Sequence, residues 1–153
     1  MLSLHVVGGK GDLGKWSGPV AARRPLTSQA ELDILKAIWE SGPTTVRELN
    51  ARLRRGGRRW AYTTVLTLLQ RLQAKGYVAS DKTGLAHVFR AVVSRDRLLR
   101  QRLKDLANQL CEGTPALLVL ALVQNQHFSD DEIEQFRRLL DQLEGTKEKE
   151  KKR

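Results

Sequence analysis

The stretch from Trp60 to Val78, WAYTTVLTLLQRLQAKGYV, constrains the fold more than any other part of the chain. Its aliphatic residues recur at i, i+3, i+4 and i+7, which predicts one apolar stripe of an amphipathic helix: Val65, Leu68, Leu69 and Leu72. The opposite face carries the uncharged polar side chains Thr63, Thr67 and Gln70, with Thr64 and Arg71 on one flank. Base edges in a DNA major groove suit such side chains. A threonine-rich surface helix is the alternative, and the surrounding sequence favours the first interpretation.

Two helices are predicted before this one. Ser28 with Glu31, and Thr45 with Glu48, form capping boxes, the signature of a helix N-terminus. Apolar residues at helical spacing follow each box, and Gly42-Pro43 ends the first of the two helices. The sequence therefore predicts two short helices upstream of the threonine-rich one.

A basic loop and a hairpin complete the predicted domain. Residues 54–59, RRGGRR, lead into the threonine-rich helix, and Gly76 ends it. Two strand-like runs follow, from Tyr77 to Asp81 and from His87 to Val92. Three helices followed by a hairpin predict a winged helix-turn-helix domain over residues 26–93, mainly α with a small β-wing. The third helix stands in the recognition position.

The order of these motifs resembles the penicillinase-repressor family, the BlaI, MecI and CopY group. The segment LTSQAELDILKAIWESGPTTVRELNARL is followed by a tryptophan, by YTTVLTLLQRLQAKGYV and by a short wing. The resemblance runs from about Leu26 to about Leu143. It implies a transcriptional repressor that binds an inverted-repeat operator in double-stranded DNA as a homodimer.

The same interpretation assigns the DNA contacts. Base readout is expected from the polar face of the third helix, which comprises Thr63, Thr64, Thr67, Gln70 and Arg71. Phosphate contacts are expected from polar or basic residues around that helix and in the wing: Thr45, Arg54, Arg55, Arg58, Arg59, Tyr62, Lys75, Lys82 and His87.

The charge distribution agrees with a nucleic-acid-binding half. The chain has 27 Lys plus Arg against 17 Asp plus Glu, a formal net charge of +10. Residues 1–90 hold 15 basic and 6 acidic side chains, whereas residues 91–153 hold 12 and 11. This asymmetry indicates a basic module joined to a nearly neutral one. Basic surface also suits anionic membranes or RNA, so the charge only supports the assignment.

The ends of the chain are predicted to lie outside the fold. Residues 1–25 are rich in glycine without sustained periodicity and are expected to form a flexible arm. Their glycines match neither the P-loop nor the dinucleotide fingerprint. Residues 145–153 form a charge run and are expected to be a disordered tail.

The same residues predict a cytoplasmic protein. No apolar run approaches the ~20 residues that span a bilayer, so no membrane insertion is expected. No signal peptide is recognisable at the N-terminus. The single Cys111 excludes an intramolecular disulfide and fits a reducing compartment.

Three further helices are predicted over residues 94–144, beginning near Ser94, Thr114-Pro115 and Ser129. They carry more Leu and Val than so small a unit can bury by itself. We therefore expect a helical dimerisation region whose interface contains Leu103, Leu106, Leu110, Leu117, Leu118, Leu120, Ala121, Ile133, Phe136, Leu139, Leu140 and Leu143. The alternative is that these helices pack back onto the winged domain.

No catalytic or metal-binding constellation is present in the sequence. His5, His87 and His127 are scattered, and with Cys111 they show no metal-ligand spacing. No serine has a nucleophile-elbow context. We predict no enzyme activity, no metal and no cofactor. A winged-helix module for protein–protein interaction is the alternative function.

The resemblance also bears on how repression is relieved. Copper-responsive members of the family carry a C-terminal cysteine cluster, and this tail has no cysteine, so that route is excluded. Members that respond to β-lactams are cut at an Asn-Phe bond in the dimerisation helices, where residues 118–123 read LVLALV. The resemblance still implies a membrane sensor-protease as a candidate partner, which would cut at another bond.

Overall fold

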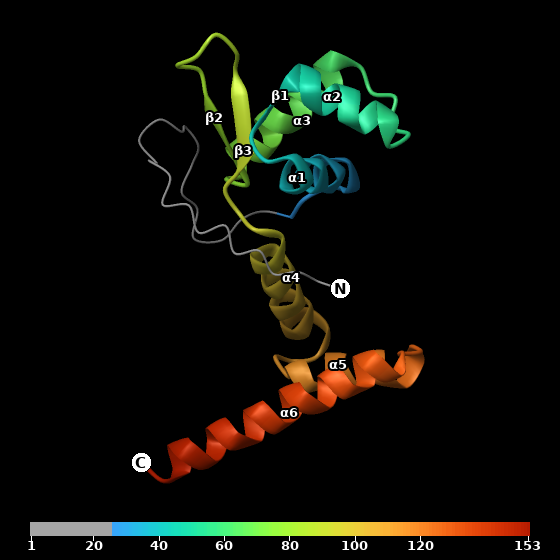
Figure 1. Ribbon diagram of the computed structural model, residues 1–153, viewed down its shortest axis with the longest axis vertical. Coiled ribbons are helices and arrows are strands. Elements are labelled where there is room, and N and C mark those ends of the chain that lie inside the picture. The colour runs from blue at the N-terminus through green and yellow to red at the C-terminus, as the bar shows by residue number, and fades with distance from the viewer. Residues whose placement is uncertain (1–25) are drawn as a thin grey trace. The chain divides into compact units, whose positions relative to one another are not determined.

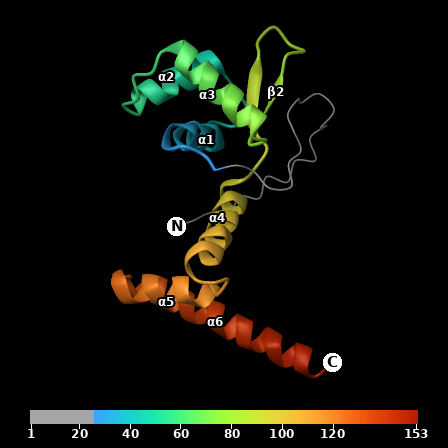
Figure 2. The same cartoon turned by 180° about the vertical axis from the view of Figure 1, so that it is seen from behind.

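The computed structural model describes residues 26–153, which fall into two units, one running through Arg100 and the other starting at Gln101 (Figures 1 and 2). The arm predicted for residues 1–25 lies outside the described residues.

The first unit has the predicted winged helix-turn-helix fold. Its elements are α1 (Gln29–Ser41), β1 (Thr44–Thr45), α2 (Val46–Arg55), α3 (Tyr62–Ala74), β2 (Val78–Asp81) and β3 (Val88–Ala91). The three helices contact one another, and both views show α3 between α2 and the β2–β3 hairpin (Figures 1 and 2). The hairpin is the wing.

Both predicted capping boxes are confirmed. Ser28 Oγ accepts a hydrogen bond from Glu31 N at 3.2 Å, and Glu31 Oε2 accepts one from Ser28 N at 2.7 Å. Thr45 and Glu48 make the same reciprocal pair at the start of α2. Gly42 ends α1 with a φ of 75°, a conformation that favours glycine.

The sheet has three antiparallel strands in the order β1-β3-β2. In the wing, Val78 of β2 pairs with Ala91 of β3, close to the predicted strand ends. Thr44 of β1 pairs with Phe89 of β3. The sequence did not predict β1, because two residues are too few to show the alternation that marks a strand. Buried Thr44 ties the start of α2 to the wing.

The core of the first unit lies between the helices and the sheet. The predicted apolar stripe of α3, comprising Val65, Leu68, Leu69 and Leu72, is buried there together with Leu35 and Ile38 of α1. Tyr77 and Phe89 add the two largest fully buried side chains. Each buried side chain of this size contributes roughly 1.5–3 kcal/mol of transfer free energy.

The first unit continues into α4 (Arg95–Leu110), beyond the boundary predicted at residue 93. Leu98 is buried in the winged-helix core, and the Trp39 indole Nε1 donates a hydrogen bond to the Val93 carbonyl at 2.8 Å. The first turn of α4 therefore belongs with the winged-helix unit.

The second unit contains the rest of α4, α5 (Pro115–Asn125) and α6 (Asp130–Lys151). As predicted, Pro115 opens α5 and Ser129 caps α6. The structure differs from the disordered tail predicted for residues 145–153, because α6 continues to Lys151. Lys and Glu are good helix formers, and Thr146 Oγ1 donates to the Gln142 carbonyl at 2.8 Å. The charge run therefore extends an existing helix.

Within residues 26–153 no single helix is long and apolar enough to cross a membrane. Helices α4 and α5, which are bent at 98° to each other, reach the required length and apolar composition only when they are counted together.

Candidate nucleic-acid interface

The polar face of α3 is open to solvent along its length. All five residues predicted to read bases are exposed: Thr63, Thr64, Thr67, Gln70 and Arg71. Four of them, together with Leu68, line a shallow hollow on the surface of the helix. The buried stripe on the other side of α3 packs on the core, so this polar face is turned outward by the fold.

The Thr67 side chain makes one hydrogen bond within α3 and keeps other groups free for contact with a ligand. Its hydroxyl donates a hydrogen bond to the Thr63 carbonyl one turn earlier, at 2.9 Å. The donor is therefore engaged, while an oxygen lone pair and the methyl group stay available. A hydroxyl held in this way can accept a hydrogen bond from a base amino group, and its methyl can contact a thymine methyl.

The predicted phosphate contacts differ in availability. Arg54, Arg55 and Arg59 are exposed, and none of the hydrogen bonds and ion pairs found among residues 26–153 engages their guanidinium groups. Tyr62, in the first turn of α3, is also exposed. Arg54 and Arg55 are in the last turn of α2, Arg59 is in the loop before α3, and Tyr62 is the first residue of α3.

Arg58 is engaged within the protein. Its Nη2 lies 2.6 Å from Asp33 Oδ2 of α1, and its guanidinium carbon lies 5.8 Å from the centre of the Trp60 ring. The predicted phosphate contact at Arg58 therefore competes with an internal ion pair.

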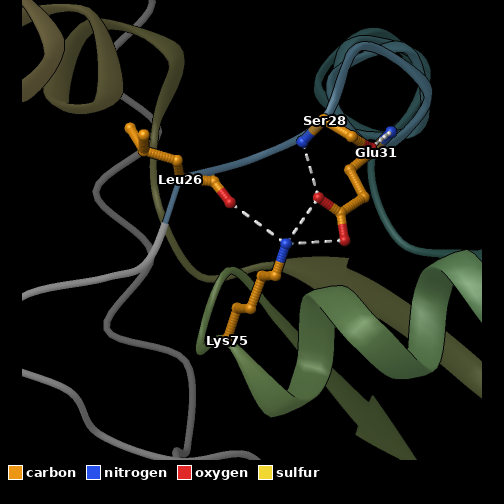
Figure 3. A network of polar contacts seen from close by, with 4 residues as sticks. All are labelled: Leu26, Ser28, Glu31 and Lys75. Carbon is orange, nitrogen blue, oxygen red and sulfur yellow. Dashed lines mark hydrogen bonds and ion pairs between the residues drawn. The ribbon is translucent and has the colours of Figure 1, made fainter.

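Lys75 has an internal role that the sequence did not show. Its ammonium donates to both carboxylate oxygens of Glu31, at 2.9 and 2.8 Å, and to the Leu26 carbonyl at 3.0 Å (Figure 3). Because these acceptors engage the ammonium, the predicted phosphate contact at Lys75 competes with an internal network. Burial opposes ionisation of Glu31, but the hydrogen bonds from Lys75 and Ser28 keep its pKa below 4.5.

Thr45 is likewise occupied by helix capping. Its hydroxyl donates to Glu48 Oε2 at 3.0 Å and accepts from the Glu48 amide at 3.3 Å. Hydrogen bonds to the Glu48 carboxylate from the Thr45 backbone amide, at 2.9 Å, and then from the Thr45 hydroxyl lower the pKa of Glu48. The structure thus gives Thr45 a folding role, independent of any contact with DNA.

The wing carries two of the predicted phosphate contacts, Lys82 and His87. Lys82 is exposed near its tip, where Asp81 Oδ1 accepts from the Thr83 amide at 2.9 Å and shapes the turn. His87 is half-buried against Phe89, with ring centres 4.3 Å apart. Burial, and then the positive charge of Lys82, lower the pKa of His87 below 6.5, while Asp81 raises it. His87 is therefore unsuited to contact a phosphate as a cation at neutral pH.

This environment of His87 predicts a pH dependence of stability. The unfolded chain binds a proton at His87 more readily than the folded chain, so the contribution to stability is present above pH 6.5 and is lost as the pH falls towards the lowered pKa. We expect His87→Gln to lose less thermal stability than wild type between about pH 7.5 and about pH 5.5. The matched control is His127→Gln at an exposed position. Equal losses in His87→Gln, the control and wild type would contradict the prediction.

Sequence reasoning missed the residues that hold the loop before α3. The side chain of Asn50, buried in α2, donates through Nδ2 to the Trp60 carbonyl at 3.0 Å. Asp33 pairs with Arg58 as described above. The signal for Asn50 was present, since a polar residue beside Leu49 on the apolar side of α2 indicates an internal hydrogen bond. The pairing of Asp33 joins distant segments and had no sequence signal.

A model of one protein family, penicillinase repressor, matches residues 27–142, which covers both the winged domain and most of the C-terminal helices. The chain belongs to the penicillinase repressor family. The family assignment made from the sequence motifs is thereby confirmed, as is the prediction of a regulatory protein with no enzyme activity, because the family consists of repressors.

Individual relatives agree with the penicillinase repressor assignment. The chain is similar to the penicillinase repressor of Bacillus licheniformis, with 26% identity over 80% of this chain and 95% of the relative. It is also similar to the methicillin resistance regulatory protein MecI of Mammaliicoccus sciuri, with 27% identity over 74% of this chain and 91% of the relative. A solved structure of a MarR family protein from Bacillus stearothermophilus aligns at a TM-score of 0.43 and 25% identity, over 80% of this chain and 76% of that chain.

Proposed function

We propose that this protein is a sequence-specific transcriptional repressor that binds an inverted-repeat operator as a homodimer. The observation that carries the proposal is the exposed, nearly uncharged hydrogen-bonding face of α3, presented by a winged helix of the penicillinase repressor family. Thr63, Thr64, Thr67, Gln70 and Arg71 would read base edges in the major groove. Such a repressor works where the DNA is, which for this family places it in the cytoplasm.

Arginines beside α3 would provide the electrostatic part of binding. Arg54 and Arg55 are exposed at the C-terminal end of α2, Arg59 is exposed in the loop that leads into α3, and Lys82 is exposed in the wing. Contacts of this kind neutralise phosphates, release counterions and fix the register of the protein on DNA, but do not select a sequence. The winged-helix interaction module without DNA binding is disfavoured, because it gives these cations no partner.

The C-terminal helices would form the dimer. Of the twelve residues predicted for the interface, Leu118 is half-buried and the other eleven are exposed within the chain. An apolar surface of this kind on α5 and α6 is typical of an association surface. A second copy would cover it, and a twofold dimer would present two α3 helices to two half-sites.

Selection from a random pool of duplexes tests this function. The protein is expected to enrich one inverted repeat with a fixed spacing between its halves, and footprinting should show both halves protected. Enrichment of no sequence above the input pool would contradict the proposal.

The arginine contacts make a separate prediction. Arg59→Ala should weaken binding to all duplexes about equally and reduce the salt dependence by roughly one counterion equivalent. Salt titrations of the variant and wild type on cognate and shuffled duplexes measure both effects. Arg97→Ala on α4 is the charge-matched control, and identical slopes for Arg59→Ala and wild type would remove Arg59 from the interface.

A further inference from the structure

Helix α1 carries two carboxylates that pair with cations at opposite ends of α3. Glu31 pairs with Lys75, the C-cap residue of α3, at 2.8 Å. Asp33 pairs with Arg58, in the loop just before α3, at 2.6 Å. Both ends of the helix that would read DNA are therefore connected to one helix of the scaffold.

At the C-terminal end of α3 the carboxylate of the pair is almost fully buried. Glu31 is 2% exposed, while the Lys75 side chain is 28% exposed. Figure 3 shows the carboxylate of Glu31 between the Ser28 amide and the Lys75 ammonium, which also reaches the Leu26 carbonyl. Each charged group has several directional partners, so the pair fixes both distance and orientation.

The connection at the N-terminal end is reinforced by its neighbours. The Asp33 side chain is 14% exposed and the Arg58 side chain 50%, and Asp33 Oδ1 accepts a hydrogen bond from Gln29 Nε2 at 3.0 Å. Arg58 lies against the Trp60 ring, and the Trp60 carbonyl accepts from Asn50. The residues leading into α3 are thus held by side chains from both α1 and α2.

We propose that Glu31 and Asp33 are positioning residues for DNA readout, which hold the two ends of α3 so that its polar face meets base edges in the correct orientation. This rests on the proposed function of α3. The apolar stripe of α3 supplies non-directional contacts, which permit small rotations and shifts of the helix. Base readout requires side chains held to within a fraction of an ångström by supporting groups. Ion pairs at both ends supply that constraint: the buried Glu31 carboxylate holds Lys75, and Asp33 holds the more exposed Arg58. A buried ion pair can add more to uniqueness of structure than to net stability, and at the Glu31 end this is its role in the proposal.

The test uses the fact that lost charge and lost positioning change DNA binding in opposite directions. Glu31→Gln and Asp33→Asn each remove one negative charge and leave Lys75 or Arg58 unpaired, so electrostatics alone would strengthen binding to every duplex. Positioning predicts instead that the ratio of cognate to non-specific affinity falls by about tenfold in each variant, with non-specific affinity unchanged or higher. Competition titrations with cognate and shuffled duplexes measure this ratio.

Controls separate positioning from charge and from unfolding. Glu40→Gln removes the same charge from an exposed position on α1 and should leave the ratio as in wild type. A double variant, Glu31→Gln with Lys75→Gln, should be no worse than Glu31→Gln alone, because the two residues act as a pair. Non-specific affinity and thermal unfolding report whether each variant is folded. If Glu31→Gln does not fold, Asp33→Asn, at the more exposed pair, decides the question.

The outcomes are distinguishable from failure of the proposed function. A wild type that binds all duplexes equally overturns the proposed function itself. A wild type that prefers its cognate site, with folded Glu31→Gln and Asp33→Asn variants that match Glu40→Gln, overturns only the positioning role.

Discussion

Replacing Phe136 with Asp is expected to make the protein monomeric and to weaken its binding to a two-half-site operator by about two orders of magnitude, because the second half-site is no longer reached by a linked copy. Phe136 lies on α6, packs edge-to-face against Phe128 with ring centres 5.0 Å apart, and is 38% exposed. In the proposed dimer this exposed part is covered by the partner copy. A carboxylate placed there without a partner would cost several kcal/mol.

Sedimentation and half-site titrations check the Phe136 prediction. Binding to a single half-site should be nearly unchanged, because the winged-helix core contains no residue of α6. Gln135→Asp introduces the same charge at the neighbouring, exposed position and should remain dimeric. A Phe136→Asp protein that stays dimeric, or a wild type that is monomeric at micromolar concentration, would contradict the proposed dimer.

Thr67→Ala is expected to lose roughly 1–3 kcal/mol of binding free energy on the cognate site while non-specific binding stays nearly intact. Gln70→Ala should behave in the same way. Thr67 is the better test, because it lies closer to the N-terminal half of α3, which sits deepest in the groove of helix-turn-helix proteins. The substitution removes two identified groups: the hydroxyl, which is held by the Thr63 carbonyl, and the methyl group.

A second substitution at the same position separates the two contacts of Thr67. Thr67→Val keeps a methyl group at the surface of the helix and removes only the hydroxyl. If the methyl contacts a thymine, Thr67→Val should keep most of the affinity that Thr67→Ala loses. A loss that is equal on cognate and shuffled duplexes would mean that Thr67 supports the helix and does not read bases.

The elements of the fold were largely predictable because their signals are local. Capping boxes at Ser28, Thr45 and Ser129 mark three helix starts, and the stripe of α3 identifies its buried side. Strand β1 was missed because its pairing with β3 joins segments more than 40 residues apart and leaves no periodic pattern. Residues 145–153 were predicted to be disordered because of their charge. Lys and Glu also favour helix, and α6 continues through them to Lys151.

The candidate site was predictable only as far as the helical wheel determines it. The wheel places the readout residues on the outer face of α3, and the structure exposes them. It gives no information about which cations are already engaged, because Lys75 and Arg58 find their acceptors on α1 through tertiary packing. The surroundings of His87 were not predicted either: its ring lies against Phe89 two residues later, and the charges of Lys82 and Asp81 in the same hairpin act on it.

The central claim, that α3 reads a DNA sequence, is tested most directly by titrating the wild-type protein against its selected inverted repeat and a shuffled duplex of equal length and composition. At about 0.15 M salt we predict that the selected repeat binds at least about a thousandfold more tightly than the shuffled duplex. Equal affinity for the two duplexes, with both falling steeply as salt rises, would reduce the protein to a non-specific polycation and contradict the claim.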